Sequence, residues 1–490
     1  MLMMYVHTHW SYRHPYAART WRESDWRGYL RGLRAIGYDA VMVWPLLDCM
    51  PAQPTASDQA FLERTGRALQ FARNELGMSV FVTAGPNAMG NERSATYAFE
   101  DRAYFHCDRR INPRDRGAVA DFLAGRRRQL APLGAFDGLV VIDSDPGGWP
   151  GSTNEEFVNL AAAQLEMARE LSPRVMFFYW MWMGWELYNR VWEAPASGGQ
   201  ERPPPPTKMA VFTETLRLFE KRLSEPWGVL ACTSDHVEAT DQVGMGSRRL
   251  FNPYGIVELE PAFPITQYWP TALRDRLAEY TPARFPHGAM ANSQTHAMQL
   301  PHAYLFAHYA RGGRENGVDL RGFAERLIAG AGDKIARGWE AIGAGDPGAQ
   351  RVAAEALRPL VGRAHRTGDC VGLLFDDPDR FLADLIHSLE IHAALTEFQS
   401  AAEGGPAAGR PALRALVPRV RAQLVRTGFN DAYCDDRLEV SLNRVLKRFN
   451  DPRINEALTN FRNWSDPVKH HGAISKLLDV LEVYAAAEKT

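Results

Sequence analysis

Acidic side chains gather at three places where a short apolar run of the sequence ends. The run GLVVIDSD ends in Asp143 and Asp145, GIVELE contains Glu258 and Glu260, and VLACTSD ends in Asp235. Residues two apart on a strand share a face, so the first two runs each offer a pair of carboxylates. Two carboxylates that flank a glycosidic bond can hydrolyse it, because one protonates the leaving oxygen and the other activates water or attacks the sugar.

The first of these runs predicts the general acid. Asp145 precedes a Pro-Gly-Gly turn, and Trp149 follows that turn. A carboxylic acid close to a Trp ring and to another carboxylate tends to have a raised pKa, which a general acid requires. We therefore predict Asp145 as the acid and Asp143 as a ligand for hydroxyl groups. The alternative for either residue is to cap the following turn or helix.

Three acidic residues compete for the role of base or nucleophile. We expect Glu258, or failing that Asp235, to activate water or attack the sugar, with Glu260 binding hydroxyls or tuning a neighbouring pKa. The structural alternative for the glutamate pair is an ion pair with Arg248 or Arg249. Those arginines could also bind a substrate carboxylate in a bidentate manner.

The stretch MYVHTHW near the start of the chain places two histidines one residue apart. An HxH pair can hold a catalytic metal, and metal-dependent amidohydrolase barrels begin with one. Those enzymes also need a Lys on the fourth strand, His on the fifth and sixth, and Asp on the eighth. This chain has His236 on the sixth, no Lys on the fourth, no His on the fifth, and Asn292 in place of Asp on the eighth. We expect His7 and His9, beside Trp10, to donate hydrogen bonds to a sugar, with no metal and no cofactor. Metal-dependent hydrolysis of an amide or ester through His7, His9 and His236 stays an alternative, and so does a non-catalytic barrel that binds carbohydrate.

Aromatic and amide side chains cluster near the same predicted strand ends. Aromatic rings stack on the C–H faces of sugars, and amides and imidazoles bond to hydroxyl groups. Core packing is expected to account for about half of the aromatic residues, because alternate strand residues point toward the helices. Besides His7, His9, Trp10 and Asp143, the predicted substrate-binding set contains Trp44, Asn87, Trp149, Trp180, Trp182, His236, Tyr268, Trp269, Asn292 and His296.

A regular alternation of predicted strands and helices would position these acidic, aromatic and amide side chains. Eight short apolar runs alternate with helix-like segments over the first 310 or so residues, which predicts a (β/α)8 barrel with its site at the carboxyl ends of the strands. A doubly wound sheet is the alternative, but no GxGxxG loop follows the first strand. The predicted strands are 4–9, 40–45, 79–85, 138–145, 174–180, 229–235, 255–260 and 287–293.

The sequence changes character after residue 311. Beyond it, apolar positions recur at three- and four-residue spacing, as in helices. We therefore predict a catalytic barrel over 1–311 and an all-α domain over 312–490. The helical domain could support a homodimer or close over the pocket.

Composition favours an ordinary globular enzyme. The 490 residues carry a formal net charge of -2, which does not predict a nucleic-acid partner. The run Arg126-Arg127-Arg128 is predicted to be a solvated helix face. Five scattered cysteines predict neither a disulfide framework nor a zinc cluster. The chain shows no secretion signal and no membrane span, so we expect a cytoplasmic protein whose partner is an oligosaccharide substrate.

At two places the sequence resembles the bacterial α-glucuronidases, which are (β/α)8 glycosidases with a helical domain after the barrel. The segment IDSDPGGWPG is similar to an Asp-Ser-Glu segment followed by a Pro-Gly turn, and the resemblance implies that Asp145 is the general acid. The segment IVELEPAFPITQYW places Glu258 in the matching strand and echoes an Ile-Thr-Gln run. The family carries a catalytic Glu directly after that Gln, where this chain has Tyr268. The resemblance therefore implies a sugar hydrolase acting with inversion, on a uronic acid, a hexosaminide or another sugar, but it leaves the base unassigned.

Overall fold

The computed structural model describes most of the chain. The described ranges are 1–9, 13–102, 109–144, 147–149, 151–183, 207–224, 226–253, 257, 265–363, 365–428, 445–461 and 473–487. The predicted site residues Trp10, Asp145, Glu258 and Glu260 lie outside these ranges.

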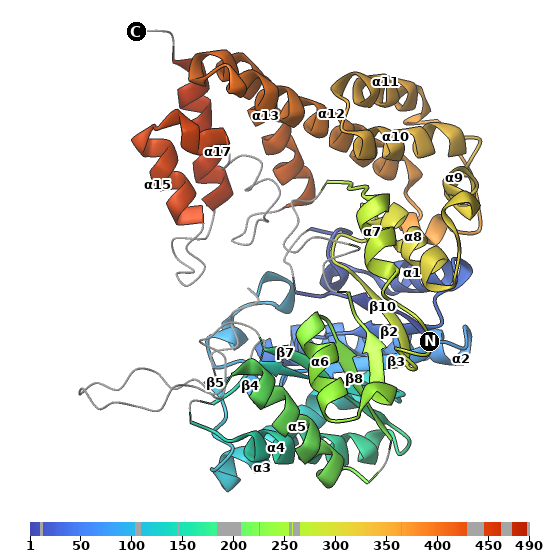
Figure 1. The fold of residues 1–490 in the computed structure, drawn as a ribbon, viewed down its shortest axis with the longest axis vertical. Helices are drawn as coiled ribbons and strands as arrows, with labels where there is room; N and C mark the ends of the chain where they lie inside the picture. Colours follow the sequence, from blue (N-terminus) through green and yellow to red (C-terminus); the bar gives the residue numbers. More distant parts are fainter. Residues whose placement is uncertain are drawn as a thin grey trace. The chain divides into compact units, whose positions relative to one another are not determined.

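Eight parallel strands close into a barrel, as the sequence predicts (Figure 1). Going around the barrel, the strands follow one another in chain order, and the last returns to lie beside the first. The barrel strands are β1 (Leu2–Val6), β2 (Ala40–Val43), β3 (Ser79–Ala84), β6 (Gly138–Ser144), β7 (Met176–Met183), β8 (Trp227–Ala231), β9 (Arg249–Phe251) and β10 (Gly288–Ser293). A separate antiparallel pair, β4 (Ala88–Met89) and β5 (Arg109–Arg110), follows β3.

The prediction of the seventh strand is wrong. The seventh place in the barrel belongs to β9, whose Leu250 and Phe251 pair with β8 on one side and β10 on the other. The predicted run 255–260 begins after this strand has ended, and its described residue Val257 lies in a bend. The strand has only three residues and begins with an arginine, so its apolar signal is weaker than that of GIVELE. The predicted sixth strand is also too long, because it ends at Ala231.

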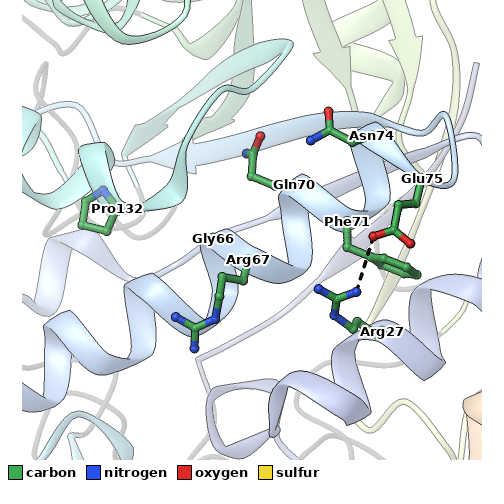
Figure 2. A pocket seen from close by; sticks show the side chains of 8 residues that line it. All are labelled: Arg27, Gly66, Arg67, Gln70, Phe71, Asn74, Glu75 and Pro132. Atoms are coloured by element: carbon green, nitrogen blue, oxygen red, sulfur yellow. Dashed lines mark ion pairs between the residues drawn. The ribbon is translucent and has the colours of Figure 1, made fainter.

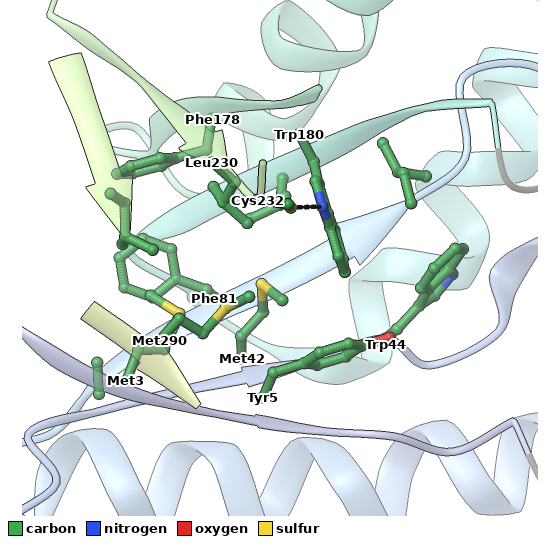
Figure 3. Packing of buried hydrophobic residues seen from close by; sticks show 14 residues of the cluster. Met3, Tyr5, Met42, Trp44, Phe81, Phe178, Trp180, Leu230, Cys232 and Met290 are labelled. Atoms are coloured by element: carbon green, nitrogen blue, oxygen red, sulfur yellow. Dashed lines mark hydrogen bonds between the residues drawn. The ribbon is translucent and has the colours of Figure 1, made fainter. Parts of the chain in front are cut away.

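The barrel interior is filled by large apolar side chains from all eight strands (Figure 3). Gly138 and Gly228 make room for them: a Cβ at these positions would lie 2.1 Å from ring atoms of Phe81 and Phe178 respectively. The interior is therefore a packed core, as in other barrels of this type. Its buried members are Met3, Tyr5, Ala40, Met42, Trp44, Phe81, Val140, Ile142, Phe178, Trp180, Leu230, Cys232, Leu250 and Met290.

Helices between the strands cover the outside of the barrel. Capping boxes begin two of them, formed by Thr55 with Asp58 and by Thr153 with Glu156. The helices are α1 (Glu23–Ala35), α2 (Ala56–Asn74), α3 (Arg116–Leu130), α4 (Asn154–Leu171), α5 (Lys208–Arg222) and α6 (Ser234–Gln242). A further helix, α7 (Pro270–Leu277), precedes β10 in the chain.

The prediction of a solvated basic face on α3 is wrong for one residue. Arg126 is fully buried and forms an ion pair with the equally buried Asp48, with 2.7 Å between Nη2 and Oδ1. Arg127 and Arg128 are exposed. The run of three arginines does not show that Arg126 is buried, because its partner Asp48 lies 78 residues away in the sequence.

Two compact units make up the chain. One contains 1–10, 21–254 and 276–292, and the other contains 11–20, 255–275 and 293–490. The predicted domain boundary at residue 311 stays a prediction. Within the described ranges, no helix combines the length and apolarity that crossing a bilayer requires.

The second unit is helical, as predicted for the end of the chain. In it, α12 packs against α11 and α13, and α17 packs against α13 and α15. A short antiparallel pair, β11 (Ile328–Ala329) and β12 (Arg366–Thr367), interrupts the helices. The helices are α8 (Leu300–Ala310), α9 (Leu320–Leu327), α10 (Gly332–Ala344), α11 (Pro347–Leu357), α12 (Pro378–Glu403), α13 (Pro406–Thr427), α15 (Pro452–Phe461) and α17 (Ala473–Ala486).

Candidate functional site

The histidine pair lies directly after β1, at the carboxyl end of the barrel. The Nδ1 atoms of His7 and His9 are 3.1 Å apart, and each side chain is 4% exposed. One of these nitrogens must donate and the other accept, so the two rings share one proton between them. The His7 ring lies 4.1 Å from the ring of Tyr5, and the His9 ring meets the edge of Trp44 at 4.5 Å. The pair can therefore act as a fixed hydrogen-bonding group or as two nitrogen ligands.

Trp44 follows β2, and its orientation is fixed by a buried carboxylate. Its Nε1 donates to Oδ2 of Asp48 at 2.9 Å, and its carbonyl accepts from the hydroxyl of Thr8. The same carboxylate accepts from the backbone N–H of Gly85 at 3.1 Å and from Arg126. Burial lowers the pKa of Arg126, and the charge of Asp48 opposes that shift. The sequence analysis missed Asp48, and the available signal was an acidic residue four positions after a Trp at a strand end.

Asp143 faces the helices and not the barrel axis. It is fully buried and accepts a hydrogen bond from the hydroxyl of Tyr179. The ring of Tyr179 lies 5.9 Å from Phe157 on α4 and 5.1 Å from Phe219 on α5, and burial raises the pKa of its phenol. The preceding residue, Ile142, points inward and belongs to the interior core, and the register between β6 and β7 shifts between Ile142 and Ser144.

Asn87 holds the turn that follows the predicted acid. Its Nδ2 donates to the carbonyls of Ile111 at 2.8 Å and Gly148 at 3.1 Å, and its Oδ1 accepts from the N–H of Gly148 at 2.9 Å. A Cβ on Gly147 would lie 2.5 Å from Cγ of Pro86, so this turn packs closely on the loop after β3. The amide of Asn87 thus uses both donors and its acceptor within the protein.

A buried thiol joins the ends of three neighbouring strands. The Sγ of Cys232 accepts from Trp180 Nε1 at 3.2 Å, marked in Figure 3, and from Asn252 Nδ2 at 3.1 Å. Burial raises the pKa of the Cys232 thiol to about 12. The N–H of Cys232 donates to Nδ1 of His236 at 3.0 Å, and burial, with the nearby charge of Lys208, lowers the pKa of His236 to about 3. His236 is therefore a neutral imidazole whose Nδ1 is occupied.

Other predicted residues of the barrel differ in their exposure. Asp235 is exposed in the first turn of α6, after the end of its strand. Trp149 and Trp182 are half-buried, whereas Asn292 is buried at the end of β10. Trp44 and Trp180, at 2% and 1% exposure, belong to the packed interior. Of the predicted aromatic residues that the structure describes in the barrel, Trp149 and Trp182 therefore keep part of their surface exposed, as sugar stacking needs.

Three predicted residues belong to the helical unit. The N–H of Trp269 donates to Nε2 of His302 on α8 at 2.6 Å, and the ring of Tyr268 stacks on the same imidazole. Burial raises the pKa of Tyr268 to about 12. His296 is buried in the segment between β10 and α8. Tyr268 and Trp269 are thus anchored by His302 within that unit.

A hollow of about 330 Å³ lies on the outer surface of the barrel, between α1 and α2 (Figure 2). Its charged side chains are paired, since Arg67 contacts Glu23 at 2.7 Å and Arg27 contacts Glu75 at 3.5 Å. None of the predicted site residues lines this hollow. Within the described part of the chain, no three His, Cys, Asp or Glu side chains come together as metal ligands.

Comparisons with known proteins find a distant likeness to solved structures, and none to a family model or a curated protein. A solved GH138 enzyme targeting pectin rhamnogalacturonan II is similar with a TM-score of 0.41 and 9% sequence identity. The likeness covers 87% of this chain and 62% of that enzyme, so this chain spans less than two thirds of its length. A likeness of this size carries no argument about activity, and the resemblance to the α-glucuronidases stays a prediction.

Proposed function

We propose that this chain is a glycoside hydrolase that removes sugars from the end of an oligosaccharide by carboxylate acid/base catalysis. The observation that carries the proposal is the closure of the parallel barrel, because all carboxyl ends of its strands then lie at one end. The histidine pair after β1 is therefore at the same end of the barrel as the carboxyl end of β6, which Asp145 follows in the sequence. Hydrogen-bonding imidazoles and carboxylates at one end suit a substrate rich in hydroxyl groups.

Each group has a role in this proposal. Asp145 protonates the leaving oxygen, and Glu258 or Asp235 activates water or attacks the anomeric carbon. Glu260 binds a hydroxyl or tunes a neighbouring pKa, and His7 and His9 donate to the sugar. Asp143 supports β6 through Tyr179, because its carboxylate faces the helix layer.

Hydrolysis of a panel of nitrophenyl α- and β-glycosides, including glucuronides and N-acetylhexosaminides, tests the activity. Release should be unaffected by a strong chelator. Asp145→Asn should then lower kcat by about 10²- to 10⁴-fold on a glycoside with a poor leaving group, the range for loss of a general acid. The loss should be smaller on a dinitrophenyl glycoside, whose leaving group needs no proton.

Asp121→Asn is the matched control, because Asp121 is an exposed carboxylate on α3. It should leave the turnover of both substrates unchanged. Near-normal turnover by Asp145→Asn on the poor leaving group would exclude Asp145 as the acid. Failure of the wild-type chain on every glycoside, including natural oligosaccharides, would exclude the proposed activity.

The geometry of the histidine pair favours one second candidate, metal-dependent hydrolysis. The separation of 3.1 Å between the two Nδ1 atoms suits two nitrogens bound to one ion at about 2.0–2.1 Å. This function requires at least one further ligand. Activity on amide or ester probes that a chelator abolishes, together with stoichiometric metal in the purified protein, would favour it over the glycosidase.

A further inference from the structure

The buried ion pair of Asp48 and Arg126 connects two loops at the carboxyl end of the barrel. Asp48 is fully buried, and its carboxylate takes hydrogen bonds from Trp44, Gly85 and Arg126. Trp44 belongs to the loop after β2, whereas Gly85 belongs to the loop after β3. A single carboxylate thus sets the relative position of both loops.

Arg126 extends this connection. Besides Asp48, its guanidinium donates to the carbonyl of Ala88 at 2.9 Å and to Oε1 of Gln129 at 3.0 Å. The amide of Gln129 in turn donates to the carbonyl of Met50 at 3.2 Å. The network therefore reaches from α3 into both loops, and each of its charged members is paired.

The network ends on the histidine pair. The indole of Trp44, held at Nε1 by Asp48, meets the His9 ring edge-on with an interplanar angle of 90°. His9 then contacts Nδ1 of His7 at 3.1 Å. A rotation of the indole would displace the His9 ring. The hydrogen bond between Nδ1 of His9 and Nδ1 of His7 depends on the position of that ring.

We propose that Asp48 is a positioning residue, which holds the His9 imidazole through the indole of Trp44 and so maintains the hydrogen-bonding geometry of the histidine pair. The inference rests on the proposed function, in which the pair donates to the sugar. Asp48 itself touches neither the sugar nor the reacting atoms.

The test replaces both charges together, in Asp48→Leu/Arg126→Met. Removing a buried ion pair as a whole leaves no unpaired charge, so the barrel should still fold. The acceptor of the Trp44 N–H is lost. We expect the indole Nε1–H resonance of Trp44 and the imidazole ¹⁵N resonances of His7 and His9 to move. The kcat for the glycoside that the wild-type chain hydrolyses should fall about tenfold or more, with a smaller change in KM, because misplaced groups mainly affect the chemical step.

A second buried ion pair in the same unit is the matched control. Asp58 and Arg102 have 0% and 1% side-chain exposure. Their side chains both bond to Thr55, the N-cap residue of α2, and Arg102 also donates to the carbonyl of Cys49. Asp58→Leu/Arg102→Met should alter stability like the first double variant. It should leave the histidine resonances and the ratio of kcat to KM unchanged.

The outcomes separate the positioning role from the proposed function. Unchanged histidine resonances in Asp48→Leu/Arg126→Met, or equal changes in both double variants, would overturn the positioning role. If the wild-type chain hydrolyses no glycoside, the proposed function fails, and the resonances still decide whether Asp48 orients the pair. Should the double variant not fold, Trp44→Phe removes the indole N–H that Asp48 accepts and leaves the Asp48–Arg126 ion pair intact, and unchanged imidazole resonances of His7 and His9 in that variant would likewise overturn the positioning role.

Discussion

Asn87 and Asn252 are buried amides near the carboxyl ends of barrel strands, but their hydrogen bonds differ. Asn87 uses both donors and its acceptor to fix a turn. Asn252 donates to the sulfur of Cys232, while its Oδ1 is buried without a partner among the described residues. An unsatisfied buried acceptor costs about 1–3 kcal/mol. Asn252 therefore contributes little to stability, as is common for residues kept for function.

Replacing each amide by leucine tests this difference. Asn252→Leu should leave the free energy of unfolding unchanged or raise it by about 1 kcal/mol, because it removes the unsatisfied oxygen. Asn87→Leu should lower it by about 2–3 kcal/mol, because it leaves the buried groups of the Gly148 turn without partners. Urea unfolding of both variants measures the contrast. Equal destabilisation by the two changes would contradict this assignment.

His236 makes stability depend on pH in a defined direction. Burial holds its pKa at about 3 in the folded chain, against 6.5 for an ordinary histidine, and its Nδ1 accepts the N–H of Cys232. Between pH 6.5 and pH 3, His236 binds a proton in the unfolded chain but not in the folded chain. The contribution of neutral His236 is therefore complete above pH 6.5, and it falls by about 1.4 kcal/mol per pH unit toward pH 3.

The variant His236→Gln isolates that contribution. The difference in unfolding free energy between wild type and variant should be constant above pH 7. It should then shrink by about 1.4 kcal/mol for each pH unit below 6.5. Urea unfolding at several pH values between 7.5 and 5.0 gives the slope. A difference that stays flat over this range would show that the folded chain accepts the proton as easily as the unfolded chain.

At the scale of elements, the alternation of apolar residues predicted the strands better than it predicted their faces. Seven of the eight predicted strands overlap the observed ones, and the missed one is the three-residue β9. Alternation shows which residues share a face but not which face lies inside, because barrel closure decides that. The sequence therefore paired Asp143 with Asp145 as site residues, whereas Asp143 contacts Tyr179 on the helix side. Contacts such as Asp48 with Arg126 join distant positions and leave no local pattern.

The turn after β6 depends on a glycine with a positive φ. Gly148 has a φ of 85°, and its N–H and carbonyl are both bonded to Asn87. Gly148→Ala should lower the free energy of unfolding by about 1–2 kcal/mol, the cost of this conformation for a residue with a Cβ. Gly117→Ala is the control, because its new Cβ would meet only Asp115 Oδ1 at 3.4 Å at the exposed start of α3. It should be neutral or stabilising by about 0.5–1 kcal/mol. A neutral Gly148→Ala in urea unfolding would contradict the strained turn.

At the scale of the whole molecule, the helical unit is assembled from three separate stretches of the chain. The hydroxyl of Tyr16 donates to the carboxylate of Asp384 on α12 at 3.0 Å, and the N–H of Thr266 donates to Ser388 at 2.9 Å. These contacts span 368 and 122 positions of the sequence. The change in residue pattern at 311 predicts where the helices begin, but it cannot show that earlier segments fold with them.

Cutting the chain at the predicted boundary tests this arrangement. A fragment of residues 1–311 would carry the segments 13–20 and 265–275 without the helices that accept their buried hydrogen bonds. Exposed backbone and apolar groups of this kind favour aggregation over a cooperative fold. We therefore expect a fragment with weak near-UV circular dichroism and no cooperative urea transition. Co-expression with residues 312–490 should restore both signals, because it returns the missing partners. If the fragment alone unfolds cooperatively as a monomer with native-like spectra, the two early segments are not needed for the barrel, and the boundary at 311 gains direct support.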